Sequence, residues 1–344
     1  DVYKRQRFDP TNNTWLTSWT PSNGGMPSSG DEDVYSMKVI GDDLWVGTYA
    51  QNGWQTNSDV HTLNGTTGTW SSTAAGSGNL PSGYPADFAV CADIVHVAMG
   101  YLGWWAPGGI GRYDTASSTW ISNFRAQSGE ISNDDVRSLA CDDANEILYS
   151  AYDTDGIGVG RYLYGGQDLK LSDITAQDGI SEEAVFPGGL LYHNNKLMIS
   201  HLANNRGGFS LIGVVGVNLG TGSLVDPGLE TGSIVVKPTT SGTDAYAIGR
   251  NGGTSGNSRV DLLDSTGFTP GGIDTFTALS SGRVLEIVSS GNKVWALAGE
   301  DVTSGYGNSI LEGTLVSGEV RWDRSFSLGA ETGNELLVDG NRLW

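Results

Sequence analysis

Residues 34–70 read VYSMKVIGDDLWVGTYAQNGWQTNSDVHTLNGTTGTW, and this stretch predicts four short β-strands. An apolar run over 34–40 turns through Gly41-Asp42-Asp43 into a second run over 44–49. A longer loop then leads to 60–63, and a turn over 65–68 leads to Trp70. Gly, Asn and Asp favour such tight turns because they tolerate backbone conformations that strain other residues.

Leu44 and Trp45 are adjacent in the second expected strand, so their side chains point to opposite faces of the sheet. Both are large and apolar, and we therefore expect both faces of the sheet to be buried. The composition agrees, since 51 of the 344 residues are Gly and 11 are Trp. This much Gly disfavours helices and the aromatic residues disfavour disorder, which leaves a β-rich globular fold with many tight turns.

The same element recurs along the chain at a spacing of about 50 residues. Its copies begin at Leu44, Val95, Leu148, Leu197, Ala245, Val294 and Leu343, so successive copies are 48 to 53 residues apart. A second element, Asp or Asn followed six residues later by Trp, occurs at Asp9–Trp15, Asn64–Trp70 and Asp114–Trp120. Four strands per repeat of this length are typical of a β-propeller blade. The sequence therefore predicts an all-β propeller of seven blades, each of four antiparallel strands.

The ends of the sequence bear on how such a propeller closes. The chain starts within the outer strands of one expected blade and stops within the second strand of another, so strands from both ends can complete one blade. Residues 1–6, DVYKRQ, resemble translated adaptor sequence in a metagenomic fragment, and we expect them to be non-native or frayed. Residues 7–344 are expected to form a single propeller domain; truncation at both ends, leaving an open array, is the alternative.

The net charge of the chain limits the classes of partner that it can bind. Asp and Glu number 39 against 19 Lys and Arg, which gives a net charge of −20. So acidic a surface repels phosphate backbones and anionic lipids, and nucleic acid and membrane surfaces are therefore poor candidates. No apolar run approaches the roughly 18 residues that a membrane helix needs, so we expect no membrane insertion within this stretch. A glycan or a protein or peptide ligand is the expected partner.

The repeat resembles the two-component-regulator propeller family. The similarity rests on Leu80-Pro81-Ser82, on Leu44-Trp45-Val46-Gly47-Thr48 and on Tyr113-Asp114 followed by Trp120. Kelch repeats are similar in the last of these, but the Gly-Gly doublet that they place after the second strand is missing here, so kelch ranks second. The resemblance implies a propeller of a sensor ectodomain or a free-standing surface protein, and hence an extracellular or cell-surface location. It implies no particular activity.

Blade topology puts the tight turns on one face and the longer loops on the other, and we expect the loop face to bind ligand because its sequence can vary without breaking the sheets. Its least repetitive residues are the candidate ligand-binding residues: Trp54, Tyr101, Trp104, Trp105, Asn204, Arg206, Arg250 and Tyr306. Exposed aromatic rings beside polar groups grip sugar rings or peptide backbones. For Trp104 and Trp105 themselves the favoured interpretation is packing, with one ring covering the adjacent blade and the other the channel mouth, and ligand binding is the alternative.

Asp153-Thr154-Asp155-Gly156 resembles the opening of a calcium loop, which alternates oxygen ligands and needs Gly at its turn. Tyr164 stands at the twelfth position, where such a loop has Glu, so an acidic β-turn is favoured. Asp153 and Asp155 are kept as the candidate calcium ligands, and no other cofactor is expected. His96 belongs to a column of bulky residues that includes Trp45 and Tyr149, and we expect it to pack rather than bind metal.

The two cysteines, Cys91 and Cys141, are 50 residues apart and therefore occupy equivalent places in neighbouring repeats. They can form a disulfide if their Cα atoms lie within about 7 Å. Cysteine is also a good small buried residue, and on that ground we favour free thiols.

No nucleophile elbow and no phosphate-binding glycine loop occurs in the sequence. The leading hypothesis is a non-catalytic binding or scaffolding propeller of a secreted or cell-surface protein, which recognises a glycan or peptide through one loop face. A carbohydrate-active hydrolase or lyase that uses loop carboxylates such as Asp153, Asp155, Glu300 or Asp301 is the second hypothesis. A ligand-sensing ectodomain of a signalling receptor is the third.

Overall fold

The structure is a computed structural model. It describes residues 8–9, 12, 14–15, 33–52, 55–101, 107–152, 158–164, 168–178, 189–203, 206–225, 239–241, 245–250, 259–264, 267–268, 274–275, 283–299, 308–316, 319–328, 335–339 and 342–343. The chain divides into two compact units. Unit 1 comprises Asp1–Tyr152, Gly160–Leu171 and Leu337–Trp344, and unit 2 comprises Asp153–Val159 and Ser172–Leu336.

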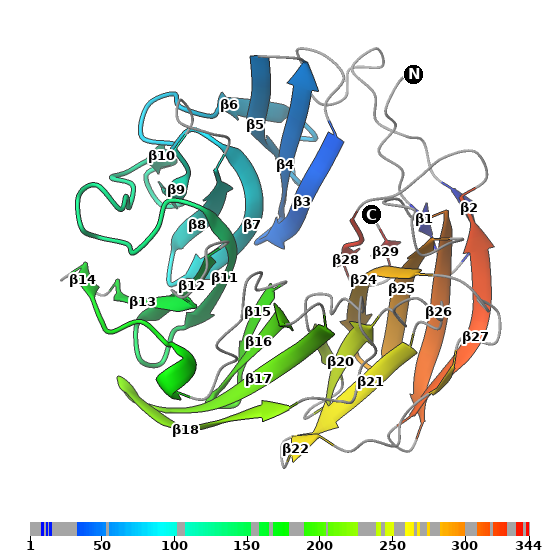
Figure 1. The fold of residues 1–344 in the computed structure, drawn as a ribbon. Helices are drawn as coiled ribbons and strands as arrows, with labels where there is room; N and C mark the ends of the chain where they lie inside the picture. The colour runs from blue at the N-terminus through cyan, green and yellow to red at the C-terminus, as the bar shows by residue number, and fades with distance from the viewer. Residues whose placement is uncertain are drawn as a thin grey trace. The chain divides into compact units, whose positions relative to one another are not determined.

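Unit 1 holds four antiparallel sheets of four strands each (Figure 1). The first consists of β3 (Asp33–Ile40), β4 (Asp43–Asn52), β5 (Gln55–Leu63) and β6 (Trp70–Ala74). The second consists of β7 (Tyr84–Cys91), β8 (Ile94–Gly100), β9 (Gly109–Asp114) and β10 (Thr119–Trp120). The third consists of β11 (Val136–Asp142), β12 (Ile147–Tyr152), β13 (Val159–Leu163) and β14 (Leu169–Lys170). In each of the three, consecutive strands are neighbours, as the repeat predicts.

The fourth sheet of unit 1 is built from both ends of the chain. Its order is β2 (Thr14–Trp15), β1 (Phe8–Asp9), β29 (Arg342–Leu343) and β28 (Val338–Asp339). Phe8 of β1 pairs antiparallel with Leu343 of β29. The expectation that strands from the two ends complete one blade is confirmed.

Unit 2 holds three further antiparallel sheets among the residues that the structure describes. The first consists of β15 (Gly189–His193), β16 (Lys196–Ala203), β17 (Arg206–Val215) and β18 (Asn218–Val225). The second consists of β19 (Thr239–Ser241), β20 (Ala245–Arg250), β21 (Arg259–Asp264) and β22 (Gly267–Phe268), and β23 (Asp274–Thr275) also pairs with β21. The third consists of β24 (Arg283–Ser290), β25 (Lys293–Gly299), β26 (Ser309–Val316) and β27 (Glu319–Ser327). The described residues include one short 3-10 helix, η2 (Ala176–Asp178), and no described helix has the length and apolarity to cross a membrane. The number of blades stays a prediction.

The first sheet follows the expected strands closely, with one difference in its longest connection. The expected loop over 50–59 is instead a continuation of the β4–β5 hairpin, in which Asn52 pairs with Gln55. Polar side chains do not prevent these residues from pairing, because an antiparallel hairpin needs only backbone hydrogen bonds at its outer end.

The tight turns between third and fourth strands repeat the same hydrogen bonds in two sheets. The Asn64 side chain accepts a hydrogen bond from the Thr67 hydroxyl at 2.9 Å, and the Asp114 carboxylate accepts one from the Ser117 hydroxyl at 2.8 Å, in each case three residues further on. The turn between β5 and β6 also requires Gly68, whose φ is +69°, in the left-handed region that favours glycine. The Asp/Asn-to-Trp frame is therefore a turn that folds the two outer strands together.

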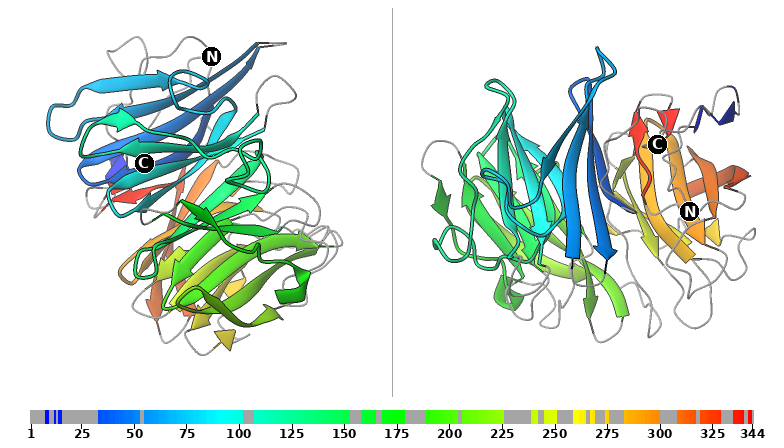
Figure 2. Two further views of the ribbon diagram at one scale, coloured as in Figure 1. Left: turned by 90° about the vertical axis from the view of Figure 1, so that its left-hand side faces the viewer. Right: turned by 90° about the horizontal axis from the view of Figure 1, so that it is seen from above.

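Leu44 and Trp45 are both buried, and they belong to different cores. Leu44 packs with Val46 and Leu63, whereas Trp45 packs with Val60 and with residues of the next sheet. This confirms that both faces of the sheet are covered. Figure 2 shows the sheet β3–β6 in blue beside the sheet β7–β10 in cyan.

The first strands β3, β7 and β11 are neighbours, and side chains join them. The Ser36 hydroxyl donates to the Pro85 carbonyl at 2.9 Å. The buried carboxylate of Asp87 accepts hydrogen bonds from the hydroxyl of Ser138 at 2.8 Å and the backbone N–H of Leu139 at 2.9 Å. These contacts link equivalent strands across the face-to-face packing of neighbouring sheets.

Cys91 and Cys141 lie at equivalent ends of β7 and β11, and they form a disulfide. Their Cα atoms are 5.7 Å apart, within the range that a disulfide spans. The expectation of free thiols was wrong. The physical reason is the packing of β7 beside β11, which brings the same position of two successive repeats together.

Candidate functional site

Most of the sequence-predicted ligand residues fall outside the described part of the chain. These are Trp54, Trp104, Trp105, Asn204 and Tyr306, together with the candidate calcium ligands Asp153 and Asp155. Arg206 and Arg250 are described in their backbone and are strand residues: Arg206 opens β17 opposite Ala203, and Arg250 ends β20 opposite Arg259. The expectation that both lie in loops was wrong, because the hairpins are longer than their polar sequence indicates.

Tyr101 is the predicted ligand residue whose side chain the structure describes. It follows β8 directly and is 38% exposed. Its backbone N–H donates a hydrogen bond of 2.8 Å to the carboxylate of Asp135, just before β11. Tyr101 is therefore held at the end of the sheets where second strands end and first strands begin, which is the predicted loop face.

Three more tyrosines gather at this end of unit 1. The Tyr35 and Tyr84 rings are 4.7 Å apart between centroids, and the Tyr49 ring lies 6.1 Å from Tyr35 and 5.6 Å from Tyr84. Tyr84 is buried, whereas Tyr35 is 45% exposed. Gly100 permits this arrangement, because a Cβ atom there would collide with the Tyr84 ring.

An arginine completes the group. The Arg137 guanidinium lies over the Tyr84 ring, 5.1 Å from its centroid, and its Nε is 3.0 Å from the carboxylate of Asp135. That carboxylate also accepts the Tyr101 N–H, so Asp135 holds Arg137 and Tyr101 together. We call Tyr35, Tyr49, Tyr84, Tyr101, Asp135 and Arg137 the loop-face cluster.

The electrostatics of the loop-face cluster are those of a binding surface at neutral pH. Burial, and secondarily the charge that Tyr35 would carry, raise the pKa of Tyr49, so its hydroxyl stays protonated and can donate. The buried Tyr84 hydroxyl has no hydrogen-bond partner among the described residues. The cluster therefore offers aromatic faces, neutral hydroxyls and one guanidinium.

Tyr35 and Arg137 were not predicted, and a structural signal explains their role. Each lies at a β-bulge in a first strand: the pairing register shifts between Val34 and Ser36 in β3, and between Val136 and Ser138 in β11. The same shift recurs in β7 and β24. A bulge re-aims a side chain, and here it turns a strand residue toward the loop face. The bulged positions of β3, β7 and β11 follow one another at a step of 51 residues, so the repeat spacing could have located the others once one bulge was known.

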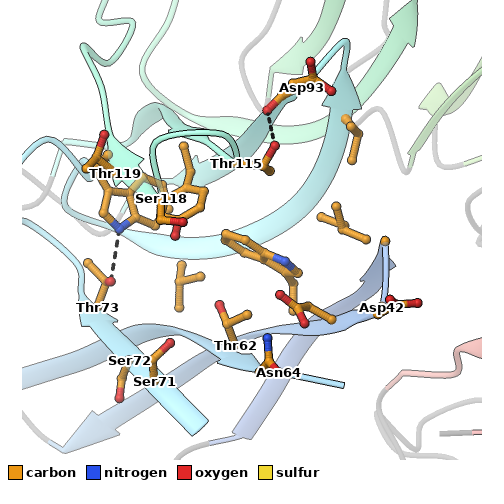
Figure 3. A pocket seen from close by; sticks show the side chains of 18 of the residues that line it. Asp42, Thr62, Asn64, Ser71, Ser72, Thr73, Asp93, Thr115, Ser118 and Thr119 are labelled. Atoms are coloured by element: carbon orange, nitrogen blue, oxygen red, sulfur yellow. Dashed lines mark hydrogen bonds between the residues drawn. The ribbon is translucent and has the colours of Figure 1, made fainter. Parts of the chain in front are cut away.

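A crevice opens between the first and second sheets, at the opposite, tight-turn end of the strands (Figure 3). Its volume is about 980 Å³. One wall carries Thr62 from β5 with Ser71 and Thr73 from β6, and the other carries Ser118 from the turn before β10 and Thr119 from β10. The crevice was not predicted from the sequence, because its lining combines residues of two successive repeats that only the packing of their sheets brings together.

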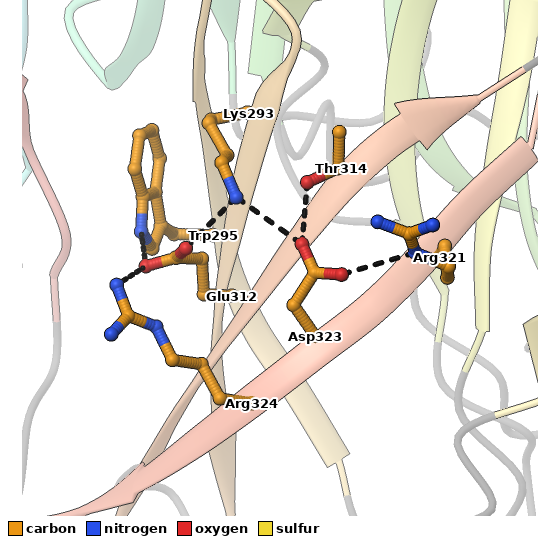
Figure 4. Close-up of polar contacts among 7 residues, drawn as sticks. All are labelled: Lys293, Trp295, Glu312, Thr314, Arg321, Asp323 and Arg324. Carbon is orange, nitrogen blue, oxygen red and sulfur yellow. Dashed lines mark hydrogen bonds and ion pairs between the residues drawn. The ribbon is translucent and has the colours of Figure 1, made fainter.

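A polar network occupies the sheet β24–β27 in unit 2 (Figure 4). The buried Glu312 carboxylate accepts hydrogen bonds from Lys293 at 3.0 Å, from Arg324 at 2.8 Å and from the indole of Trp295 at 3.3 Å. Lys293 also bonds Asp323, 3.2 Å away. Since Glu312 is saturated by donors of its own sheet, this network serves the stability of the sheet.

His96 is fully buried, with its ring 6.1 Å from that of Tyr164, so it packs as predicted. Burial, aided by the nearby charge of Arg112, lowers its pKa to about 3. Within the described ranges, no group of three or more His, Cys, Asp or Glu side chains is placed to hold a metal ion.

Comparison with known structures identifies the architecture. The chain matches the WD40 repeats of RRP9 with a TM-score of 0.60 and 9% identity, over 90% of this chain and 84% of that one. It matches a protein from Lactobacillus plantarum with a TM-score of 0.56 and 15% identity, over 83% and 82%. It matches dihydro-heme d1 dehydrogenase NirN with a TM-score of 0.55 and 11% identity, over 95% and 62%. A scan against protein-family models and a search of curated proteins found no match.

WD40 repeats form β-propellers. The match to them, together with the repeated four-stranded antiparallel sheets, shows that this chain has a β-propeller fold. At these identities the likeness concerns the fold alone, and the two-component-regulator and kelch types stay predictions from the sequence.

Proposed function

We propose that this chain is a non-catalytic binding or scaffolding propeller of a secreted or cell-surface protein, which recognises a glycan or peptide ligand through its loop face. The observation that carries the proposal is the loop-face cluster. It presents two exposed tyrosines, Tyr35 and Tyr101. Tyr35 packs against Tyr84, over which the Arg137 guanidinium lies, and Asp135 joins Arg137 to the Tyr101 backbone.

The composition of the cluster supports recognition. Tyrosine and arginine are enriched where binding energy concentrates, because each covers a large area and can also form hydrogen bonds. A tyrosine ring can stack on a sugar ring or on a peptide group, and its hydroxyl can reach a polar edge. Tyr35 lies in β3 and Tyr101 directly follows β8, so the cluster draws its exposed rings from two neighbouring sheets.

The cluster is also preorganised, which favours affinity because less side-chain freedom is lost on binding. Asp135 fixes Arg137 through an ion pair and fixes the backbone at Tyr101 through a hydrogen bond. The buried Tyr84 ring contacts both the Tyr35 ring and the Arg137 guanidinium and so helps to fix their positions. The ligand therefore meets a surface that is largely formed beforehand.

The net charge of −20 sets a preference among ligands. Long-range repulsion disfavours polyanions, whereas neutral glycans and neutral or basic peptides can approach freely. The disulfide between Cys91 and Cys141 supports a location outside the reducing cytosol, since disulfides persist in oxidising compartments.

The test is a parallel screen of the chain on a glycan array and a peptide array, with the double variant Tyr35→Ala/Tyr101→Ala beside the wild type. We expect at least one class of ligand to be retained by the wild type and to lose about tenfold or more in affinity with the double variant. Leu169→Ala is the matched control, because Leu169 is 49% exposed in β14 and lies outside the cluster. Ligands bound equally by all three proteins would refute the proposed surface.

A further inference from the structure

The crevice between the sheets β3–β6 and β7–β10 has a composition that points to a ligand of its own. Nine of the residues that line it are Ser or Thr, among them Thr62, Ser71, Thr73 and Ser118. A hydroxyl both donates and accepts, so such a lining can match another surface of hydroxyl groups in many orientations. The volume of about 980 Å³ lies at the upper end of the range of ligand pockets.

Several of these hydroxyls are available for a ligand. The side chains of Thr62, Ser71 and Ser118 make no hydrogen bond within the described part of the chain. Others are already engaged and shape the walls: the Thr73 hydroxyl accepts the indole N–H of Trp120 at 3.0 Å, which ties one wall to the other (Figure 3). The crevice thus combines fixed walls with free hydroxyl groups.

Aromatic rings form the inner surface of the crevice. The Trp45 ring packs against Tyr113 at 5.1 Å and against Trp120 at 6.4 Å between centroids, with the ring planes near perpendicular. All three line the crevice, and Tyr113 and Trp120 are only partly buried. Apolar ring surface beside hydroxyl groups matches the two kinds of surface that a sugar ring presents, its C–H face and its hydroxyl edge.

The charged groups of the lining narrow the ligand further. Those among its described residues are all acidic: Asp42 and Asp93, in the turns between first and second strands, and Asp43, the first residue of β4. The carboxylates of Asp42 and Asp93 have no side-chain partner in the described part of the chain and can accept hydrogen bonds from hydroxyl groups. Three carboxylates disfavour an anionic ligand, so the fitting class is a neutral oligosaccharide.

The neighbouring sheets show why the space exists at this interface. Thr62 stands directly across the strand pair from Trp45, and the residues at the same place in two other sheets are Arg112, opposite His96, and Glu312, opposite Trp295. Arg112 makes two hydrogen bonds to Asp168 and lies over the Phe124 ring. Glu312 is held by its own network. Where these sheets place a long charged side chain, the first sheet has a threonine and leaves the space open.

We propose that this crevice binds a neutral oligosaccharide, at a site separate from the loop-face cluster and at the other end of the same strands. The sugar stacks on the partly buried rings of Tyr113 and Trp120 and forms hydrogen bonds with Thr62, Ser71 and the turn carboxylates. The site does not depend on the ligand of the loop face.

The experiment is titration of the purified chain with neutral hexasaccharides of glucose, mannose, xylose and N-acetylglucosamine, followed by calorimetry and tryptophan fluorescence. Spermine and an oligogalacturonate hexamer are the cationic and anionic comparisons. We expect at least one neutral hexasaccharide to bind with a dissociation constant below about 1 mM and the anionic hexamer not to bind. Absence of binding by all four neutral sugars at about 10 mM, or binding of spermine alone, overturns the proposal.

Two kinds of variant separate the site from the fold. Thr62→Val with Ser71→Ala removes hydroxyls at nearly constant volume and should weaken the sugar by about 5- to 20-fold. Thr62→Arg imitates Arg112, fills the space and should abolish binding while the unfolding midpoint stays close to that of the wild type. Leu169→Ala is the control, because Leu169 is exposed in β14 and lines neither the crevice nor the loop-face cluster, so sugar affinity should stay unchanged. The titrations are repeated in the Tyr35→Ala/Tyr101→Ala background, which separates the crevice from the loop face. Sugar affinity that is insensitive to both Thr62 variants, or that is lost in this background, contradicts the assignment.

Discussion

Protonation of His96 should make this propeller sensitive to acid, and the size of the effect follows from its burial. Burial and the adjacent Arg112 lower the pKa of His96 in the folded chain to about 3, against about 6.5 when unfolded. The unfolded chain therefore binds the proton more readily. His96 hardly changes the free energy of unfolding above pH 6.5, and it lowers that free energy as the pH falls from 6.5 toward 3.

The linkage relation gives the magnitude. Between pH 7 and pH 4.5 the single proton costs the folded state about 2.5 kcal/mol, with a limiting slope of about 1.4 kcal/mol per pH unit. The variant His96→Phe keeps a ring of similar size at a position whose counterparts in other repeats include Trp45 and Tyr149, and it removes the titrating group.

The assay is urea unfolding of the wild type and His96→Phe at pH 7, 6, 5 and 4.5, followed by tryptophan fluorescence. Carboxylates titrate in both proteins, so their contribution cancels in the difference. We expect the free energy of unfolding of the wild type to fall by about 2.5 kcal/mol more than that of the variant over this range. Parallel pH profiles for the two proteins would contradict this expectation, because they would mean that His96 is accessible to protons in the folded state.

Three further predictions concern the contacts that hold the sheets together. Replacing Cys91 and Cys141 by Ala should lower the free energy of unfolding by about 4 kcal/mol, which is the chain-entropy value for a 50-residue loop. Dithiothreitol should lower the stability of the wild type by the same amount and leave that of the double variant unchanged. Gly47→Ala should cost about 2 kcal/mol in chemical denaturation, because the new Cβ would stand 2.5 Å from the Ser36 hydroxyl and 2.6 Å from the Pro85 Cβ; a neutral result would mean that β3 and β7 can move apart. Glu312→Gln should lower the free energy of unfolding by about 2 kcal/mol at pH 7, since it removes the negative charge that faces two cations. The cationic partners hold the pKa of Glu312 below its usual value, so the difference in stability from the wild type should close as acid protonates the carboxylate. A difference in the unfolding midpoint that does not change with pH would point to a packing effect instead.

The fold could be predicted from the sequence because it is encoded repeat by repeat. The turn residues and the apolar strand around Trp45 recur, so period alone identifies the blade, and the pairing of Phe8 with Leu343 followed from the positions of the chain ends. The length of the hairpins could not be predicted, because outer hairpin residues such as Asn52 and Gln55 pair through the backbone whatever their side chains.

The candidate sites were less predictable, since they depend on contacts between repeats. Tyr101 was found because an aromatic residue in a glycine-rich loop is conspicuous. Tyr35 and Arg137 were missed because each sits in a strand and reaches the loop face only through a bulge. The disulfide was missed for a related reason: equivalent positions in successive repeats are far apart in sequence, and only the packing of β7 on β11 decides their distance.

The most direct test of the proposed binding function is a crystal structure of the chain with the tightest ligand from the glycan and peptide arrays. We expect ligand density against the exposed rings of Tyr35 and Tyr101 and within hydrogen-bonding distance of Arg137. Density on a different part of the propeller, with the loop-face cluster bare, would contradict it.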